Sequence, residues 1–142
     1  MSGTDIVCFT VLGEPFGKQR PRHNRCTNTT YTPEKTRLHE QQIALEYRKQ
    51  CGNTRFSKGT YVEMKINAYM KIPKSVSKAA RAKMIDGLIR PTVKPDWDNI
   101  GKLVADALNG LAYDDDKCIV DARVRKFYSE QPRTEIVLIG RN

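Results

Sequence analysis

Closely spaced cysteines, long apolar runs and an amino-terminal targeting pattern are all missing from this chain of 142 residues. The four cysteines form no Cys-x-x-Cys pair and only two histidines are present, whereas zinc sites usually combine closely paired ligands of these types. A structural zinc site is therefore disfavoured, and we expect reduced thiols. No apolar run reaches the length of a membrane span, and the first residues lack the charged and apolar parts of a signal peptide. We accordingly expect a soluble, cytoplasmic protein with no membrane partner.

Acidic residues are scarce over most of the chain and crowded into one short segment. Lysine and arginine number 25, against 16 aspartate and glutamate residues, which gives a formal net charge of +9. Such a charge favours a polyanionic partner such as nucleic acid. Seven aspartates nevertheless fall within residues 94–121. Because carboxylates this dense repel one another unless a cation compensates them, the segment predicts a site for a hard divalent metal ion.

Hydrophobic periodicity predicts one α+β domain that spans residues 1–142. Alternation of apolar and polar residues favours strands at residues 6–12, 62–72, 118–128 and 134–139. Helical spacing and capping residues favour helices at about 33–51, 75–86 and 98–108. Within the third strand, simple alternation groups Val120 with Ala122 and Val124 on one face and leaves Asp121, Arg123 and Arg125 on the other.

The segment from Gly13 to Tyr31 is basic and has the composition of a loop. It is interrupted by prolines and glycines, and no acidic residue occurs between Glu14 and Glu34. Side chains of this kind hold phosphates and position a duplex without reading its sequence. We predict two DNA-binding groups of basic residues, one in this segment and one later in the chain: Lys18, Arg20, Arg22 and Arg25, then Lys94, Arg123, Arg125 and Lys126.

The start of the third predicted helix has the spacing of a metal site. Asp98, Lys102 and Asp106 fall in one row on a helix, with Asp98 suited to the N-cap. Asp96 shares the side of Asp98 if the chain enters the helix in an extended conformation. Two aspartates so placed can hold one metal ion between them. An EF-hand is excluded, because apolar residues stand at positions where that loop needs ligands.

A third carboxylate would come from one of the three consecutive aspartates at 114–116. The helix carries the chain away from Asp98, and a turn at Asn109-Gly110 can bring it back. A neighbouring subunit could supply this carboxylate instead. Taken singly, these acids also suit a helix cap, a helical ion pair and a polar turn, and it is their joint occurrence that favours a site.

The same segment resembles the RusA family of Holliday-junction resolvases. The resemblance rests on three pieces of sequence: Lys94-Pro95-Asp96-x-Asp98-Asn99-Ile100-x-Lys102, then Asp106-Ala107-Leu108-Asn109-Gly110, then Asp115-Asp116 ahead of Ile119-Val120-Asp121. It extends more weakly to Gly13-x-Pro15, Lys18, Arg20-Pro21-Arg22 and Tyr31-Thr32-Pro33. The resemblance covers nearly the whole chain and implies a RusA-like fold, with a mixed β-sheet and two to three helices.

The resemblance also implies roles for individual residues. Mg²⁺, for which Mn²⁺ can substitute, is expected on Asp96, Asp98 and Asp116, with Lys102 needed for cleavage. Asp115 is the alternative to Asp116 as the third ligand. Three further aspartates are expected to orient these groups: Asp106, Asp115 and Asp121. Trp97 stands where an aliphatic residue is common in the family, and we expect its side chain to point away from the metal ligands and to pack.

These features predict an Mg-dependent endodeoxyribonuclease. It would resolve Holliday junctions by paired nicking, as a homodimer, in recombination and DNA repair. Three other interpretations fit the same residues. The chain could be a non-catalytic nucleic-acid-binding domain, a metal nuclease acting on other branched or single-stranded DNA, or a protein-interaction module for which the positive charge is only solubilising.

Overall fold

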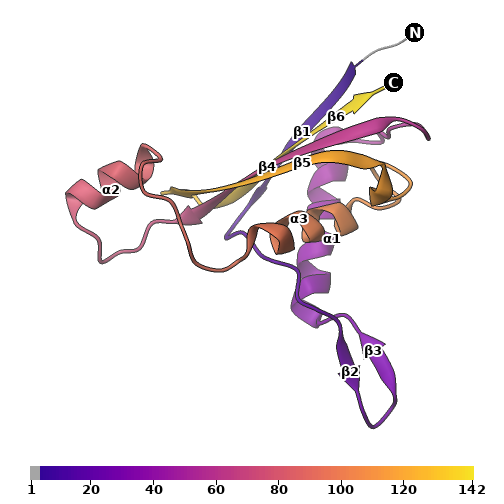
Figure 1. Cartoon of the computed structure of the whole chain (residues 1–142), viewed down its shortest axis with the longest axis horizontal. Coiled ribbons are helices and arrows are strands. Elements are labelled where there is room, and N and C mark those ends of the chain that lie inside the picture. Colours follow the sequence, from indigo (N-terminus) through magenta and orange to yellow (C-terminus); the bar gives the residue numbers. More distant parts are fainter. Residues whose placement is uncertain (1–3) are drawn as a thin grey trace.

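A four-stranded sheet with helices on one face forms the body of the protein, which is described over residues 4–142 in a computed structural model (Figure 1). The strands lie in the order β1-β6-β4-β5, and β4 and β5 are parallel whereas the other neighbours are antiparallel. Their bounds are Thr4–Leu12 (β1), Tyr61–Lys71 (β4), Ile119–Ser129 (β5) and Arg133–Arg141 (β6). The helices are Glu34–Cys51 (α1), Lys78–Ile85 (α2) and Trp97–Ala107 (α3). The expected α+β fold with a mixed sheet is confirmed, and no helix within residues 4–142 is long and apolar enough to cross a membrane.

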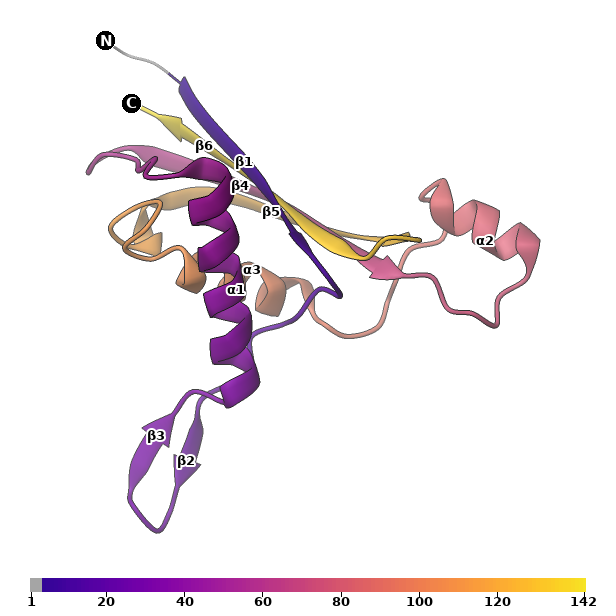
Figure 2. The same cartoon turned by 180° about the vertical axis from the view of Figure 1, so that it is seen from behind.

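The hydrophobic core lies between the sheet and two helices. In Figures 1 and 2, α1 and α3 lie on the same side of the sheet, and none of the helices drawn for residues 4–142 covers the opposite face, which we call the open face. Every second residue of β4 from Val62 to Met70 is buried against these helices, as the alternation in the sequence predicts. From the helices, Tyr47 of α1 and Ile100 of α3 enter the same core. This packing fixes α3 against β4 and β5.

The basic segment holds a β-hairpin that the sequence does not predict. Its strands are Arg22–Asn24 (β2) and Thr29–Tyr31 (β3), and both figures show it projecting beyond the first turn of α1. At the tip, Asn24 Oδ1 accepts a hydrogen bond of 2.9 Å from the amide of Cys26, and Asn28 has a positive φ of 53°. All twelve residues from 20 to 31, which we call the arm, are exposed. The expected loop is therefore wrong in part, because turn hydrogen bonds rather than an apolar face form this hairpin.

Two expectations about side-chain placement are also wrong. The N-cap of α3 is Asp96 rather than Asp98, which lies in the first helical turn. In β5, Val62 pairs with Ile119 and Glu63 pairs with Asp121, so Val120 is an extra, bulged residue and is 66% exposed. The bulge removes Val120 from the face that Ala122 shares with the core. A bulge is invisible to simple alternation, which assumes one residue opposite each partner.

Candidate functional site

The amino-terminal end of α3 presents its acids from a fixed backbone. Asp96 is extended, with φ −69° and ψ 147°, and Asp98 follows in the first turn, where the helix dipole favours a negative charge. The Oδ1 of Asp98 accepts a hydrogen bond of 3.0 Å from the amide of Asn99. The irregular segment that leads to the arm is tied to the same turn, because the amide of Lys18 donates to the carbonyl oxygen of Asn99 at 2.9 Å.

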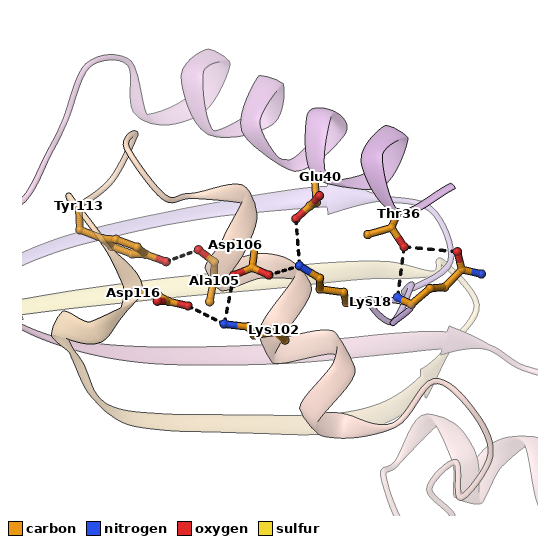
Figure 3. A network of polar contacts seen from close by, with 9 residues as sticks. Lys18, Thr36, Glu40, Lys102, Ala105, Asp106, Tyr113 and Asp116 are labelled. Atoms are coloured by element: carbon orange, nitrogen blue, oxygen red, sulfur yellow. Dashed lines mark hydrogen bonds and ion pairs between the residues drawn. The ribbon is translucent and has the colours of Figure 1, made fainter. Parts of the chain in front are cut away.

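The chain turns back after α3 and brings a third acid to the helix. Gly110 has φ 77°, and its amide donates to the carbonyl of Tyr113 at 2.8 Å. The buried Tyr113 hydroxyl donates to the carbonyl of Ala105 at 2.8 Å (Figure 3). Burial, and to a smaller degree the neighbouring acids, raises the pKa of Tyr113. This anchored turn places Asp116 Oδ2 3.0 Å from Lys102 Nζ, so the return takes place within a single chain.

Lysines and carboxylates alternate in space around α3. Lys102 Nζ lies 3.2 Å from Asp106 Oδ1, Lys18 Nζ bonds to the other oxygen of Asp106, and Glu40 of α1 lies 4.0 Å from Lys18 (Figure 3). We call these residues, together with Asp116, the acid–lysine network. Hydrogen bonds to Asp116 and Asp106 raise the pKa of Lys102, so its ammonium stays charged at neutral pH. We expect these mutual hydrogen bonds and ion pairs to hold the side chains in place before any ligand binds.

Three adjoining hollows form a groove over the start of α3. The first, which we call the α3 hollow, has a volume of about 310 Å³ and its polar rim is formed by Asp98, Lys102 and Asp116. A second hollow of about 510 Å³ is lined by Lys94, Asp96 and Arg20 among others. A third, of about 320 Å³, shares Lys102 with the first and Asn99 with the second. The three predicted metal ligands, Asp96, Asp98 and Asp116, and several predicted basic residues therefore line this groove.

The site offers carboxylate oxygens, which are the type of ligand that a hard divalent cation prefers, and two of the carboxylates line the same hollow. Across residues 4–142, no three carboxylate, imidazole or thiol side chains converge closely enough to hold a metal ion as one group. Asp98 and Asp116 nevertheless line the same hollow, and their ligand atoms are carboxylate oxygens. Mg²⁺ binds commonly through one or two carboxylates, several waters and substrate phosphates, so this pair is sufficient in number. Asp96 lines the second hollow, which shares no lining residue with the α3 hollow, so the structure does not bring this predicted ligand to the pair.

Other predicted acids lie apart from the α3 hollow. Asp115 caps the short 3₁₀ helix Asp116–Cys118 and lines none of the three hollows. Asp121 pairs in register with Glu63 on the open face, opposite α3. Asp114 bonds to Arg55, which also donates to the carbonyl of Gly110 at 2.7 Å. The structure thus brings Asp98, Lys102, Asp106 and Asp116 together and does not bring Asp115 or Asp121 to them.

The predicted basic residues divide into three groups. Lys18 is partly buried in the acid–lysine network, and Arg20 and Lys94 line the groove. Arg22 and Arg25 lie in the exposed arm. The residues of β5 lie elsewhere: Arg123 and Arg125 are on the open face, and Lys126 Nζ donates to the carbonyl of Val93 at 2.5 Å. Basic residues on the same face as the acids therefore come mainly from the segment that precedes α1.

Three residues of the site escape sequence reasoning. Glu40 joins the network from α1, and no local pattern marks it. Tyr113 anchors the returning chain, and its only signal in the sequence is its position directly before the three aspartates. Trp97 does not pack as expected, because it is 64% exposed and lines the α3 hollow beside Asp98.

Comparison with known proteins gives two matches that cover most of the chain. The family model described as Endodeoxyribonuclease RusA matches residues 13–139. The Uncharacterized protein YqaN of Bacillus subtilis (strain 168) is 41% identical over 138 residues, which is 94% of this chain and 96% of that protein. Both matches include the arm, α3 and the returning acidic segment.

Proposed function

This chain belongs to the endodeoxyribonuclease RusA family, and on that premise we propose that it is a divalent-metal-dependent endonuclease that resolves four-way DNA junctions (Holliday junctions) by paired nicking. Its place would be in DNA recombination and repair. The observation that carries the proposal is the meeting of Asp98, Lys102 and Asp116 at one hollow of a molecule whose formal net charge is +9.

Two carboxylates are assigned to the metal ion. Asp98 and Asp116 would hold it at the α3 hollow, and Asp96 lines the second hollow. Bound there, Mg²⁺ or Mn²⁺ supplies Lewis-acid polarisation of the scissile phosphate and activation of water. Both acids lie on rigid elements: Asp98 on a helix packed into the core, and Asp116 on a turn anchored by Tyr113. The protein therefore supplies orientation as well as charge.

Lys102 is assigned the role of a fixed positive charge at the scissile phosphate. Hydrolysis adds the oxygen of water to phosphorus and releases a sugar oxygen, and negative charge builds up on the phosphate oxygens on the way. A lysine is protonated at neutral pH, and the Lys102 ammonium lines the hollow between Asp106 and Asp116. Lys18 bonds to one oxygen of Asp106, and Lys102 lies against the other oxygen. By fixing the Asp106 carboxylate, Lys18 would therefore limit the positions open to the Lys102 ammonium. Lys18 is thus a positioning residue in this scheme.

DNA would be held by the groove and the arm. Arg20 lines the hollow that contains Asp96, and Arg22 and Arg25 extend positive charge along the arm. A four-way junction has approximate two-fold symmetry, so a two-fold homodimer would present two sites to opposed strands. Paired nicking follows from that symmetry.

One cleavage assay tests the proposal. Labelled synthetic four-way junctions, linear duplexes and flaps are incubated with the protein, with Mg²⁺ and with EDTA. We expect Mg²⁺-dependent nicks in the junction and little cleavage of linear duplex. Asp98→Asn should abolish cleavage and retain junction binding. The matched control is Asp86→Asn, which removes the same charge from the exposed C-cap of α2 and should cleave normally.

The outcomes separate this proposal from its alternatives. Binding without cleavage by the wild-type protein would favour a non-catalytic DNA-binding domain. Preferential cleavage of flaps or single strands would assign a different DNA structure as the substrate. Equal activity of Asp98→Asn and Asp86→Asn would remove the α3 hollow from the reaction.

A further inference from the structure

The single tryptophan of the chain is exposed at the edge of the α3 hollow. Trp97 occupies the first position of α3 and leaves 64% of its surface exposed. Indole rings carry a large apolar surface that is usually buried, and an exposed ring beside a hollow is available to stack on a flat group. Neither the metal ligands nor Lys102 require an aromatic ring at this position, so the ring is unexplained by the reaction itself.

The hollow next to Trp97 has an apolar floor and a charged rim. Along α3, Trp97, Gly101 and Ala105 follow one another at four-residue spacing and face β5. A Cβ added at Gly101 would lie 3.3 Å from Val124 Cγ2, which shows how closely the helix approaches the strand there. The floor behind this row includes the apolar residues Ala122 and Val124. The rim is the row of Asp98 and Lys102, completed by Asp116.

The lining suits a group that is flat, largely apolar and attached to an anion. The hollow measures about 310 Å³, and its lining includes Asp98, Lys102 and Asp116, where the scissile phosphate would lie. A nucleobase meets each condition, because it is joined through its sugar to the phosphate that the rim would hold. A base inside an intact duplex is stacked and paired, and it cannot reach the ring of Trp97. Only a base released from its stack can do so.

We propose that the α3 hollow receives an unstacked nucleobase next to the scissile phosphate, with the indole of Trp97 stacking on it. This inference rests on the proposed function and adds the reason why branched DNA is preferred. Unstacking a base costs least where pairing is already interrupted, as it is at a branch point. The same contact in a linear duplex must overcome the full cost of unstacking. Stacking on an aromatic side chain strengthens binding of a single base by roughly 5- to 140-fold, so it can account for selection between the two.

The experiment uses Trp97 as its own reporter. Wild-type protein in EDTA is titrated with an uncleaved four-way junction and with a linear duplex that has the sequence of its arms. Because Trp97 is the only tryptophan, its emission reports on the hollow without cleavage or metal. We expect strong quenching by the junction and little quenching by the duplex at equal occupancy. A junction that carries 2-aminopurine next to the branch point should change its own fluorescence in the same titration.

Three variants make the test specific. Trp97→Phe keeps an aromatic ring, and Trp97→Leu keeps only apolar surface. The matched control is Tyr61→Leu, which removes an equally exposed aromatic, also 64%, from the start of β4. We expect junction affinity to fall by roughly 5- to 140-fold in Trp97→Leu, to recover in part in Trp97→Phe, and to stay at the wild-type level in Tyr61→Leu. Trp97 is exposed, so thermal melting should be unchanged in its variants.

Each outcome decides between the two proposals. If the wild-type protein binds no DNA, both proposals are overturned. If junctions are bound and cleaved while Trp97 emission responds equally to junction and duplex, the proposed function stands and the nucleobase site is overturned. Equal losses in Trp97→Leu and Trp97→Phe also overturn it, because stacking requires a ring. An emission change that follows protein concentration without DNA would assign the hollow to contact between copies of this chain.

Discussion

The arm and the acid–lysine network carry charge in opposite ways. In the network, each ammonium lies against carboxylates, as Lys102 does between Asp106 and Asp116, and every side chain except that of Lys102 is partly buried. In the arm, Arg22 and Arg25 are exposed, and no acidic residue lies between positions 15 and 33. Compensated charge fixes the geometry of groups that must act together, whereas uncompensated charge stays available for a polyanion.

This contrast suggests a division of work between two neighbouring regions. The two meet at Lys18, whose backbone amide bonds to α3 and whose side chain bonds to Asp106. Changes in the network should alter cleavage at saturating protein and leave binding intact. Changes in the arm should alter binding and leave the rate within the bound complex intact.

The largest expected effect is on Lys102. Lys102→Met removes the positive charge from the rim of the α3 hollow, so single-turnover cleavage of a four-way junction should fall by roughly 10²- to 10³-fold. Junction affinity, measured by gel shift in EDTA, should stay within a few-fold of wild type. A parallel loss of affinity would show that Lys102 belongs with the binding residues and would break the comparison.

Lys18 should behave as a member of the network although it lies in the basic segment. Lys18→Met removes the partner of Asp106 and should lower single-turnover cleavage by roughly 10- to 100-fold, as loss of a group that orients catalytic side chains does. The salt dependence of binding should be unchanged, because Lys18 is already paired. Lys58→Met, at an exposed turn, is the matched control. A shallower salt dependence in Lys18→Met would instead assign Lys18 to phosphate contact.

The arm should show the reverse pattern. In Arg22→Gln/Arg25→Gln, the slope of log affinity against log salt for a duplex-armed junction should become less steep by about 1.8, since each phosphate contact contributes about 0.9. Cleavage within the saturated complex should be unchanged. The control removes two lysines from α2, which both figures place far from the arm, as Lys78→Gln/Lys83→Gln. Equal slopes for the two double variants would show that the arm makes no phosphate contact.

The smallest effect is expected on the anchor of the returning chain. Tyr113→Phe removes the hydrogen bond to the carbonyl of Ala105 in a buried setting, so the free energy of unfolding should fall by about 1–2 kcal/mol. Burial raises the pKa of Tyr113 above that of an unfolded tyrosine, so its contribution is present below about pH 10 and is lost as pH rises further. Denaturant unfolding at pH 7 and above pH 10 should therefore show less alkaline loss in the variant. An unchanged difference between the two pH values would mean that Tyr113 ionises normally in the folded protein.

The sequence predicts the elements that bury apolar residues better than those that do not. The hydrophobic periodicity of the sequence predicts strand β4 and helix α3, because one face of each is buried. No residue of the arm is buried, so its hairpin depends on turn residues such as Asn24 and Asn28 that are also common in plain loops. The sequence also fails to predict the bulge at Val120, because an alternating pattern assumes that each residue of a strand has one partner.

In the candidate site, the spacing of residues in the sequence predicts only some of the contacts. The row of Asp98, Lys102 and Asp106 follows from helical geometry, and the Lys102–Asp106 ion pair confirms it. The bond between Lys18 and Asp106 joins residues that are 88 positions apart, and only the packing of the folded chain brings them together. Simple alternation places Asp121 on the face opposite Ala122, as the structure does, but it cannot show that pairing with β4 puts Asp121 beside Glu63. Nor does local spacing show that Trp97 is exposed. Such features belong to tertiary structure.

The central claim, that Asp98 and Asp116 together hold a divalent ion, is tested most directly by titration with Mn²⁺ followed by electron paramagnetic resonance of the free ion. Wild-type protein and Asp86→Asn should remove Mn²⁺ from solution equally, and Asp98→Asn and Asp116→Asn should each lose that binding. Equal Mn²⁺ binding by all four proteins would contradict the account.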